Sequence, residues 1–194
     1  MLNTLNEDYR RLNADASQTR SQFQGVAADV EIEFCLASKD ANGASTTGIT
    51  RTATTEGYFN SNTETNKMKS NGTNGKTGWD ATKYLNIWIC NISNYANYGT
   101  AGYAYLPTSG MHGSSIDGLV IDFKLGIYYG DGRTATHEIG HYMGLQHTWG
   151  SNPPSCSKDD GFSDTPTNSS ENYGCNFNAN TCSGGDVEIG RAHV

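Results

Sequence analysis

Three histidines and one glutamate fall within eleven residues, at spacings that suit a metal ion and a water molecule activated by it. His137 and His141 are four residues apart, so on a helix they lie on one face, one turn apart. Glu138 follows the first histidine directly, where a carboxylate can take a proton from water at the metal. Gly144 tolerates a positive φ, so the helix can end there and the chain can turn to bring His147 to the same ion.

Three protein ligands leave the fourth position of a tetrahedral zinc ion open for water, which is typical of catalytic sites and not of structural ones. The pattern therefore predicts zinc bound by His137, His141 and His147, with Glu138 as the catalytic base. The short form, two histidines with a glutamate after the first, also occurs in ordinary helices as a pair of surface histidines. The third histidine and the glycine, at their fixed offsets, favour the metal site.

The composition limits the class of protein. The 194 residues suffice for one domain with a sizeable core. A formal charge of −7 and the lack of a basic run argue against a nucleic-acid partner. No apolar stretch approaches the length of a membrane span, so no membrane partner is expected. No signal peptide precedes the polar first residues, which indicates either a cytosolic protein or part of a longer precursor.

Hydrophobic periodicity predicts the elements that position the histidines. Residues 2–12 have the spacing of an amphipathic helix, and the zinc-binding helix is expected from about residue 134 to 144. Strands are predicted at residues 30–36, 48–55, 84–92, 102–107 and 118–123. The run at 84–92 is almost continuously apolar, as expected of a central strand covered on both faces. The run at 102–107 ends in proline, which edge positions tolerate better than central ones.

The sequence around the histidines resembles the pappalysin family of metzincin zinc metallopeptidases, and especially its secreted, cytophagalysin-like bacterial members. The matching segments are residues 34–37, 48–52, 83–91, 136–150, 159–166 and 172–175, together with Cys156 and Cys182. The resemblance implies an α/β (α+β) fold. It would be a metzincin-type catalytic domain with a twisted mixed sheet, an active-site helix and a loop-rich, truncated lower subdomain.

The function implied by this resemblance is that of a zinc-dependent endopeptidase, which hydrolyses peptide bonds of extracellular proteins through a metal-activated water. We expect a secreted monomer that acts on protein or peptide substrates. Two alternatives remain open. One is a truncated chain that binds zinc and cleaves nothing. The other is a secreted adhesion or glycan-binding domain, suggested by the Asn-, Gly- and Thr-rich loops, which leaves Glu138 unexplained.

The resemblance also implies where a substrate binds. In metzincins the strand that corresponds to residues 102–107 lies antiparallel at the sheet edge and pairs with the substrate backbone. We therefore expect substrate contacts at Gly102, Tyr103 and Ala104. An ordinary edge strand without a ligand is the alternative.

A second ion is expected in the loop after the third histidine, where calcium sites occur in the family. Calcium takes six to eight oxygen ligands, often from loop carboxylates and carbonyls. The candidate ligands are Asp159, Asp160, Asp164 and Thr165. The alternative is a solvated acidic loop.

The five cysteines are an odd number, which leaves one thiol over in a secreted protein. The resemblance implies a Cys156–Cys182 disulfide and leaves Cys175 without a partner, because its family partner lies beyond the Met-turn. Cys35 and Cys90 lie in predicted strands, and adjacent strands could bring them close enough to bridge. Two buried free thiols are the alternative.

The match to the family stops at residues 185–186. No methionine follows His147, so the Met-turn beneath the metal, its neighbouring tyrosine and the wall of the specificity pocket are not found. We therefore expect one catalytic domain over residues 1–186, incomplete at both ends, and a non-native tail over residues 187–194. The cleavage preference is not predicted, since the pocket that sets it is largely missing.

Overall fold

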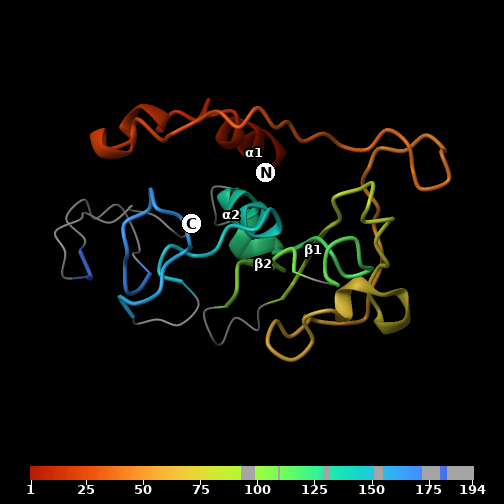
Figure 1. Cartoon of the computed structure of the whole chain (residues 1–194). Helices are drawn as coiled ribbons and strands as arrows, with labels where there is room; N and C mark the ends of the chain where they lie inside the picture. Colours follow the sequence, from red (N-terminus) through yellow and green to blue (C-terminus); the bar gives the residue numbers. More distant parts are fainter. Residues whose placement is uncertain (93–98, 109, 129–131, 151–154, 172–179, 183–194) are drawn as a thin grey trace.

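The computed structural model describes residues 1–92, 99–108, 110–128, 132–150, 155–171 and 180–182. Its main elements are α1 (Leu2–Tyr9), β1 (Ile87–Cys90), β2 (Gly102–Ala104), β3 (Leu119–Asp122) and α2 (Arg133–Tyr142). Short helical segments lie between them: η1 (Ala16–Gln18), η2 (Ser21–Phe23), η3 (Lys67–Lys69), η4 (Asn71–Thr73) and the π-helical η5 (Phe123–Tyr128). Figure 1 shows α2 near the centre, with the N-terminal segment (red to orange) running past it.

The described strands form a mixed sheet in the order β1-β3-β2, in which β1 runs parallel and β2 antiparallel to β3. Strand β3 has a neighbour on each edge, and all four of its residues are buried because packed layers cover both faces of the sheet. The prediction that the run at 84–92 is the central strand was wrong. Within the described sheet β1 lies at an edge, and Ile89 is 49% exposed.

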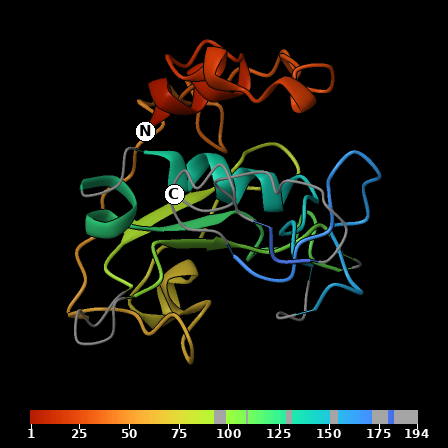
Figure 2. The same ribbon diagram turned by 90° about the vertical axis from the view of Figure 1, so that its left-hand side faces the viewer.

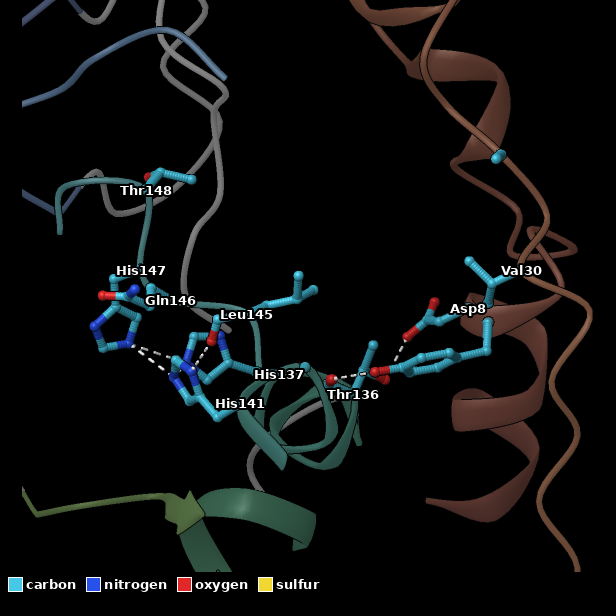
Figure 3. A pocket seen from close by; sticks show the side chains of 12 residues that line it. Asp8, Val30, Thr136, His137, His141, Leu145, Gln146, His147 and Thr148 are labelled. Atoms are coloured by element: carbon cyan, nitrogen blue, oxygen red, sulfur yellow. Dashed lines mark hydrogen bonds between the residues drawn. The ribbon is translucent and has the colours of Figure 1, made fainter. Parts of the chain in front are cut away.

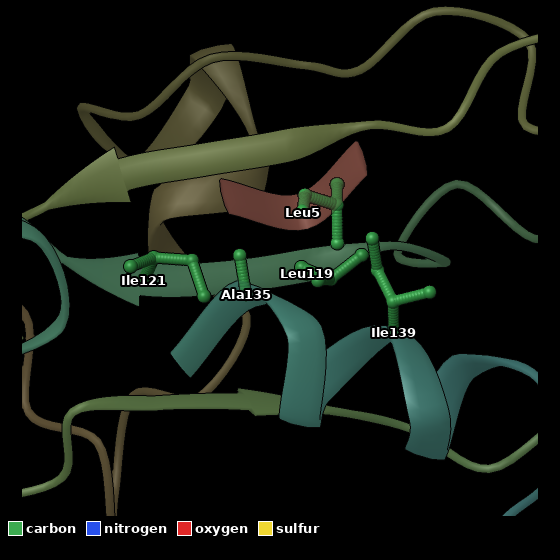
Figure 4. Packing of buried hydrophobic residues seen from close by; sticks show 5 residues of the cluster. All are labelled: Leu5, Leu119, Ile121, Ala135 and Ile139. Carbon is green, nitrogen blue, oxygen red and sulfur yellow. The ribbon is translucent and has the colours of Figure 1, made fainter. Parts of the chain in front are cut away.

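The core has a layer on each face of the sheet. On one face, residues of α1, β3 and α2 form a fully buried cluster of Leu5, Leu119, Ile121, Ala135 and Ile139 (Figure 4). Successive side chains of a strand point to opposite faces. Val120 therefore packs on the other face, in a cluster with Phe59, Met68, Trp88 and Ile92. Figure 2 shows α2 over one side of the strands and the η3 region (yellow) on the other.

A glycine brings β2 close to the central helix. At Gly102, an added Cβ would lie 2.9 Å from the Ile121 Cδ1 and 2.9 Å from the Thr134 Cγ2. A larger residue there would force the Ile121 and Thr134 side chains to shift. The edge strand is thus held directly beside the helix that carries the histidines.

Helix α1 is attached to α2 by both apolar and charged contacts. Leu5 is fully buried against the α2 side chains. The Arg133 guanidinium makes two hydrogen bonds to Asp15, at 2.6 and 2.8 Å, and lies 3.3 Å from Asp8. The Thr136 hydroxyl donates to the same Asp8 carboxylate at 2.8 Å. The predicted N-terminal helix is therefore present, though it ends earlier than residue 12.

The strands predicted at residues 30–36 and 48–55 were wrong, since neither segment forms a strand although both are described. Alternating side chains favour an extended backbone, but a strand also needs a neighbour for its hydrogen bonds. The Phe34 N–H and C=O instead bond to the side-chain amide of Asn6 in α1, at 2.7 and 2.9 Å. Leu36 and Ile49 stay about half exposed.

Cys156 and Cys182 form a disulfide, with their Cα atoms 5.7 Å apart. Cys35 and Cys90 are free thiols, the first exposed and the second half-buried. The expected Cys35–Cys90 bridge is not formed, because the segment around residue 35 does not join the sheet that contains β1. Cys175 and the predicted tail at 187–194 lie outside the described residues.

Among the described residues, no helix combines the length and apolar character that a membrane crossing requires.

Candidate metal centre

The glycine turn at the end of α2 brings the third histidine back to the helix. Gly144 has a φ of +103°. Its N–H donates to the His141 carbonyl, and the Leu145 N–H donates to the Gly140 carbonyl, both at 2.9 Å. These two bonds define a Schellman motif, which ends the helix and turns the chain. The predicted turn is confirmed, and it places His147 beside the helical histidines.

The three imidazoles converge through their Nε2 atoms (Figure 3). The His141 Nε2 lies 3.0 Å from those of His137 and His147, and the latter two are 3.3 Å apart. A neutral imidazole has one proton for its two nitrogens, so three converging nitrogens cannot all be paired by hydrogen bonds among themselves. Nitrogen ligands of a tetrahedral zinc ion lie about 3.3 Å apart. The donor set and its spacing therefore fit zinc.

Neighbouring groups orient two of these rings. The His141 Nδ1 lies 2.7 Å from the Leu145 carbonyl oxygen, which can only accept. The ring proton therefore sits on Nδ1, and the Nε2 lone pair is available to a metal. The buried indole of Trp149 stacks on the His147 ring at 4.4 Å and an interplanar angle of 16°. Sequence reasoning assigned no role to Trp149. Its only signal was an aromatic residue two positions after a predicted ligand.

Glu138 points from α2 toward β2 and is only 5% exposed. Burial raises the pKa of this carboxyl group to about 8, although the Ala104 backbone N–H, which bonds to it, acts in the opposite direction. Its Oε2 atom is buried and has no hydrogen-bond partner among the described protein groups. With this pKa the group is largely protonated at neutral pH when no metal is bound, and a cation held by the neighbouring histidines would favour the carboxylate. The carboxylate, with one oxygen available, would then be suited to accept a proton.

A pocket of about 380 Å³ opens beside the histidines (Figure 3). One wall is formed by α2 and by the loop that contains Leu145. The opposite wall comes from the N-terminal segment, through Asp8, Tyr9 and Val30. The lining is mainly apolar apart from the imidazoles, so α1 and the chain after it border the metal centre.

The predicted calcium ligands do not converge in the structure. Asp159 and Asp164 are exposed, while Asp160 is buried. The carboxylates of Asp159 and Asp160 accept the N–H groups of Gly161 and Phe162 within their own loop. In the part of the chain that is described, the histidine triad is the only grouping of three or more potential metal ligands. A calcium site that includes these residues and Thr165 stays a prediction.

The predicted substrate residues Gly102, Tyr103 and Ala104 are the three residues of β2. The strand lies at the edge of the described sheet, antiparallel to β3 and next to α2. Their contact with a substrate stays a prediction.

A histidine triad at the end of a helix, a buried glutamate beside it and a mixed sheet with an antiparallel edge strand define the class of metzincin metallopeptidases. The model of one peptidase family, M43, described as pregnancy-associated plasma protein-A, matches residues 68–191. The chain belongs to this family, the pappalysins.

Curated relatives carry names of the same kind. Extracellular metalloprotease 1 of Coccidioides posadasii is 40% identical over 99 residues, which cover 46% of this chain and 35% of that protein. An extracellular metalloprotease of Colletotrichum graminicola is 46% identical over 94 residues, covering 42% of this chain and 32% of its own length. The chain thus spans about a third of these relatives.

Solved structures of mirolysin share the fold. Mature mirolysin of Tannerella forsythia in complex with a cleaved peptide has a TM-score of 0.86 at 38% identity, covering 97% of this chain and 71% of that chain. Mirolysin in complex with compound 9 has a TM-score of 0.79 at 40% identity, covering 88% and 64%. The expected metzincin α/β fold is confirmed.

Proposed function

We propose that this chain carries the metal centre of a secreted zinc-dependent endopeptidase that hydrolyses peptide bonds of extracellular proteins. The observation that carries the proposal is the convergence of three Nε2 atoms within 3.3 Å, beside a buried glutamate with one unpartnered oxygen. Membership of a peptidase family and relatives named extracellular metalloproteases support both the reaction and the location. We further propose that the protein acts as a monomer.

His137, His141 and His147 would hold the zinc as neutral imidazoles through Nε2. When bound, zinc supplies a Lewis acid that polarises the scissile carbonyl group and makes water more acidic. The hydrogen bond from the His141 Nδ1 to the Leu145 carbonyl fixes the required tautomer before any ion arrives. The stacked Trp149 ring supports His147, which lies on a loop and lacks a helix to position it.

Glu138 would move the proton. Its free Oε2 accepts a proton from the attacking water and then gives it to the nitrogen of the leaving amine. The Ala104 N–H bonds to the same carboxylate and so limits its rotation. Burial excludes bulk water from the carboxylate, which keeps the proton within the site.

The substrate would bind along β2. An exposed strand edge offers backbone N–H and C=O groups to an extended peptide, which gives affinity that depends little on side chains. We propose that Gly102, Tyr103 and Ala104 make these backbone contacts. Support comes from the antiparallel edge position of β2 beside α2, and from the mirolysin structure that holds a cleaved peptide.

The test is casein hydrolysis by the purified chain, with and without a zinc chelator, alongside the metal content of the same samples. We expect one zinc per chain and chelator-sensitive cleavage. Glu138→Gln should keep the zinc and reduce cleavage by about 10³-fold, since only the proton transfer is lost. The control is Glu171→Gln, at an exposed glutamate. Undiminished cleavage by the Glu138 variant would contradict its role, and zinc without any cleavage would favour a non-catalytic zinc-binding module.

A further inference from the structure

Lys69 is a buried lysine on the side of β2 that faces away from the metal centre. It belongs to η3 and is 2% exposed, which is rare for a lysine. Its Nζ atom donates to the Ile116 carbonyl at 2.7 Å. Among the described residues, no carboxylate lies within ion-pair distance of it. Burial lowers the pKa of Lys69 to about 8, while the charge of the more distant Asp117 carboxylate acts in the opposite direction.

Three aromatic rings surround this ammonium group and form an aromatic cage of Trp88, Tyr103 and Tyr105. The Nζ atom lies 5.1 Å from the Trp88 centroid, 5.8 Å from that of Tyr103 and 4.8 Å from that of Tyr105. All three distances fall within the range in which a cation is attracted to an aromatic face. The rings come from β1, from β2 and from the residue just after it, so one cation joins η3 to two strands.

The cage lies on the face of β2 that is turned away from α2, the helix that carries Glu138. Tyr103 and Tyr105 flank Ala104, and alternate residues of a strand point to opposite faces. The tyrosines therefore face Lys69, while Ala104 packs on the α2 side of the sheet. Strand β2 packs directly against α2, which carries Glu138, and the Ala104 N–H favours the charged form of that carboxyl group. Displacing the two rings would move this N–H as well.

We propose that Lys69 is a positioning residue for the peptidase reaction: by holding Tyr103 and Tyr105, it fixes β2 and keeps the Ala104 N–H against Glu138. The inference rests on the proposed function. Stability alone does not account for a lysine here, because burying an ammonium group costs free energy and an apolar chain of similar length would avoid that cost. The ammonium group instead attracts the faces of the Tyr103 and Tyr105 rings, which an apolar side chain would not do.

The first test compares Lys69→Met with Lys67→Met, a control in the same turn. Lys67 lies in partly exposed ion pairs with Glu56 and Glu64. We expect Lys69→Met to keep its zinc, to exchange the backbone amide protons of β2 about 10-fold faster and to lower kcat more than it raises KM. The control should change none of these. Unchanged β2 exchange and unchanged kcat in the folded Lys69 variant would overturn the proposal.

The second test changes a ring of the aromatic cage and leaves Lys69 in place, in case Lys69→Met does not fold. Tyr105→Leu removes the ring nearest the Nζ atom, whereas Tyr105→Phe keeps the ring and removes only the hydroxyl. We expect faster β2 exchange and lower kcat in the first variant, and a much smaller change in the second. Equal behaviour of the two would overturn the proposal. If the unaltered chain cleaves no peptide, the proposed function fails, while the exchange measurement still tests how Lys69 holds Ala104.

Discussion

The sheet with α2 and the segment at residues 26–58 are both rich in apolar residues, but they bury them to very different extents. Leu119, Ile121 and Ile139 are fully buried, whereas Val30 and Leu36 are about half exposed. The difference follows from the backbone. Strand β3 has hydrogen-bonding neighbours on both edges, while residues 30–36 have no strand beside them in the part of the chain that the structure describes. An apolar pattern leads to burial only where the backbone also finds its partners.

The two regions also use polar groups differently. Beside α2, at the end of β3, Asp122 is completely buried and accepts the backbone N–H groups of Ile92, Lys124 and Leu125. In the N-terminal segment, Arg10 pairs with Asp29 and Glu33 at the surface, where solvent screens the attraction and ion pairs contribute little to stability. The first region therefore determines the geometry of the metal centre, and the second mainly borders its pocket.

The largest effect is expected from the removal of one zinc ligand in the region of the sheet and α2. We expect His141→Ala to weaken zinc binding by at least about 10²-fold and to abolish cleavage, since two ligands remain and the Leu145 carbonyl loses its donor. The measurements are zinc affinity by competition with a chromophoric chelator and helix content by circular dichroism. The control is His112→Ala, at a side chain that is 67% exposed. Zinc affinity equal to that of the unaltered chain would refute the ligand assignment.

Two matched substitutions that shorten a side chain would compare how tightly the two regions are packed. Ile139→Ala leaves a cavity between α2 and β3 and should cost about 3 kcal/mol of unfolding free energy. Leu36→Ala removes a half-exposed side chain and should change it by less than about 0.5 kcal/mol. Urea unfolding followed by tryptophan fluorescence gives both values. Equal losses would mean that residues 30–36 are packed as tightly as the core.

The smallest effect is expected at Asp15, which lies in the sequence between α1 and residues 26–58 and pairs with Arg133 of α2. The Arg133 guanidinium holds the pKa of the Asp15 carboxyl well below its usual value near 3.8. The folded protein therefore gains stability from the charged form above about pH 4, and this gain disappears as the pH falls through the folded pKa. Because Asp15 is partly exposed and its attraction to Arg133 is screened by solvent, Asp15→Asn should cost only about 0.5 kcal/mol at pH 7.

Thermal unfolding of both proteins at pH 7 and pH 2 tests this sign. The difference between them should shrink at the lower pH, because the unfolded chain then binds a proton at Asp15 that the folded carboxylate, with its lowered pKa, still resists. A difference that grows on acidification would show that the charged form of Asp15 does not stabilise its contact with Arg133 of α2.

Features of the fold that depend on neighbouring residues in the sequence could be predicted. The helix α2, its glycine stop and the histidine triad all follow from local spacing, and short apolar runs located β2 and β3. The order of the strands is not local, so β1 was assigned to the centre and residues 30–36 to the sheet. Strand order and sheet membership both depend on which segments pair with each other across the chain. The alternation of side chains along one segment does not identify its pairing partner.

The supporting residues of the site show the same limit. The Trp149 stack, the Ala104 bond to Glu138 and the burial of Lys69 all depend on residues distant in the sequence or on the path of a loop. Lys69 lies in a run of Asn, Ser, Thr, Gly and Lys, where a lysine is normally solvated. No local pattern there indicates a buried cation.

The Schellman turn at Gly144 has a consequence for how the protein acquires its metal. Leu145 closes the helix through its N–H and orients the His141 ring through its carbonyl, while the same turn delivers His147. A chain that has not yet closed this turn offers zinc two histidines instead of three, and one of them is free to rotate. Stable zinc binding therefore requires that the helix ends at the correct residue. As a result, mainly correctly folded molecules would retain the ion.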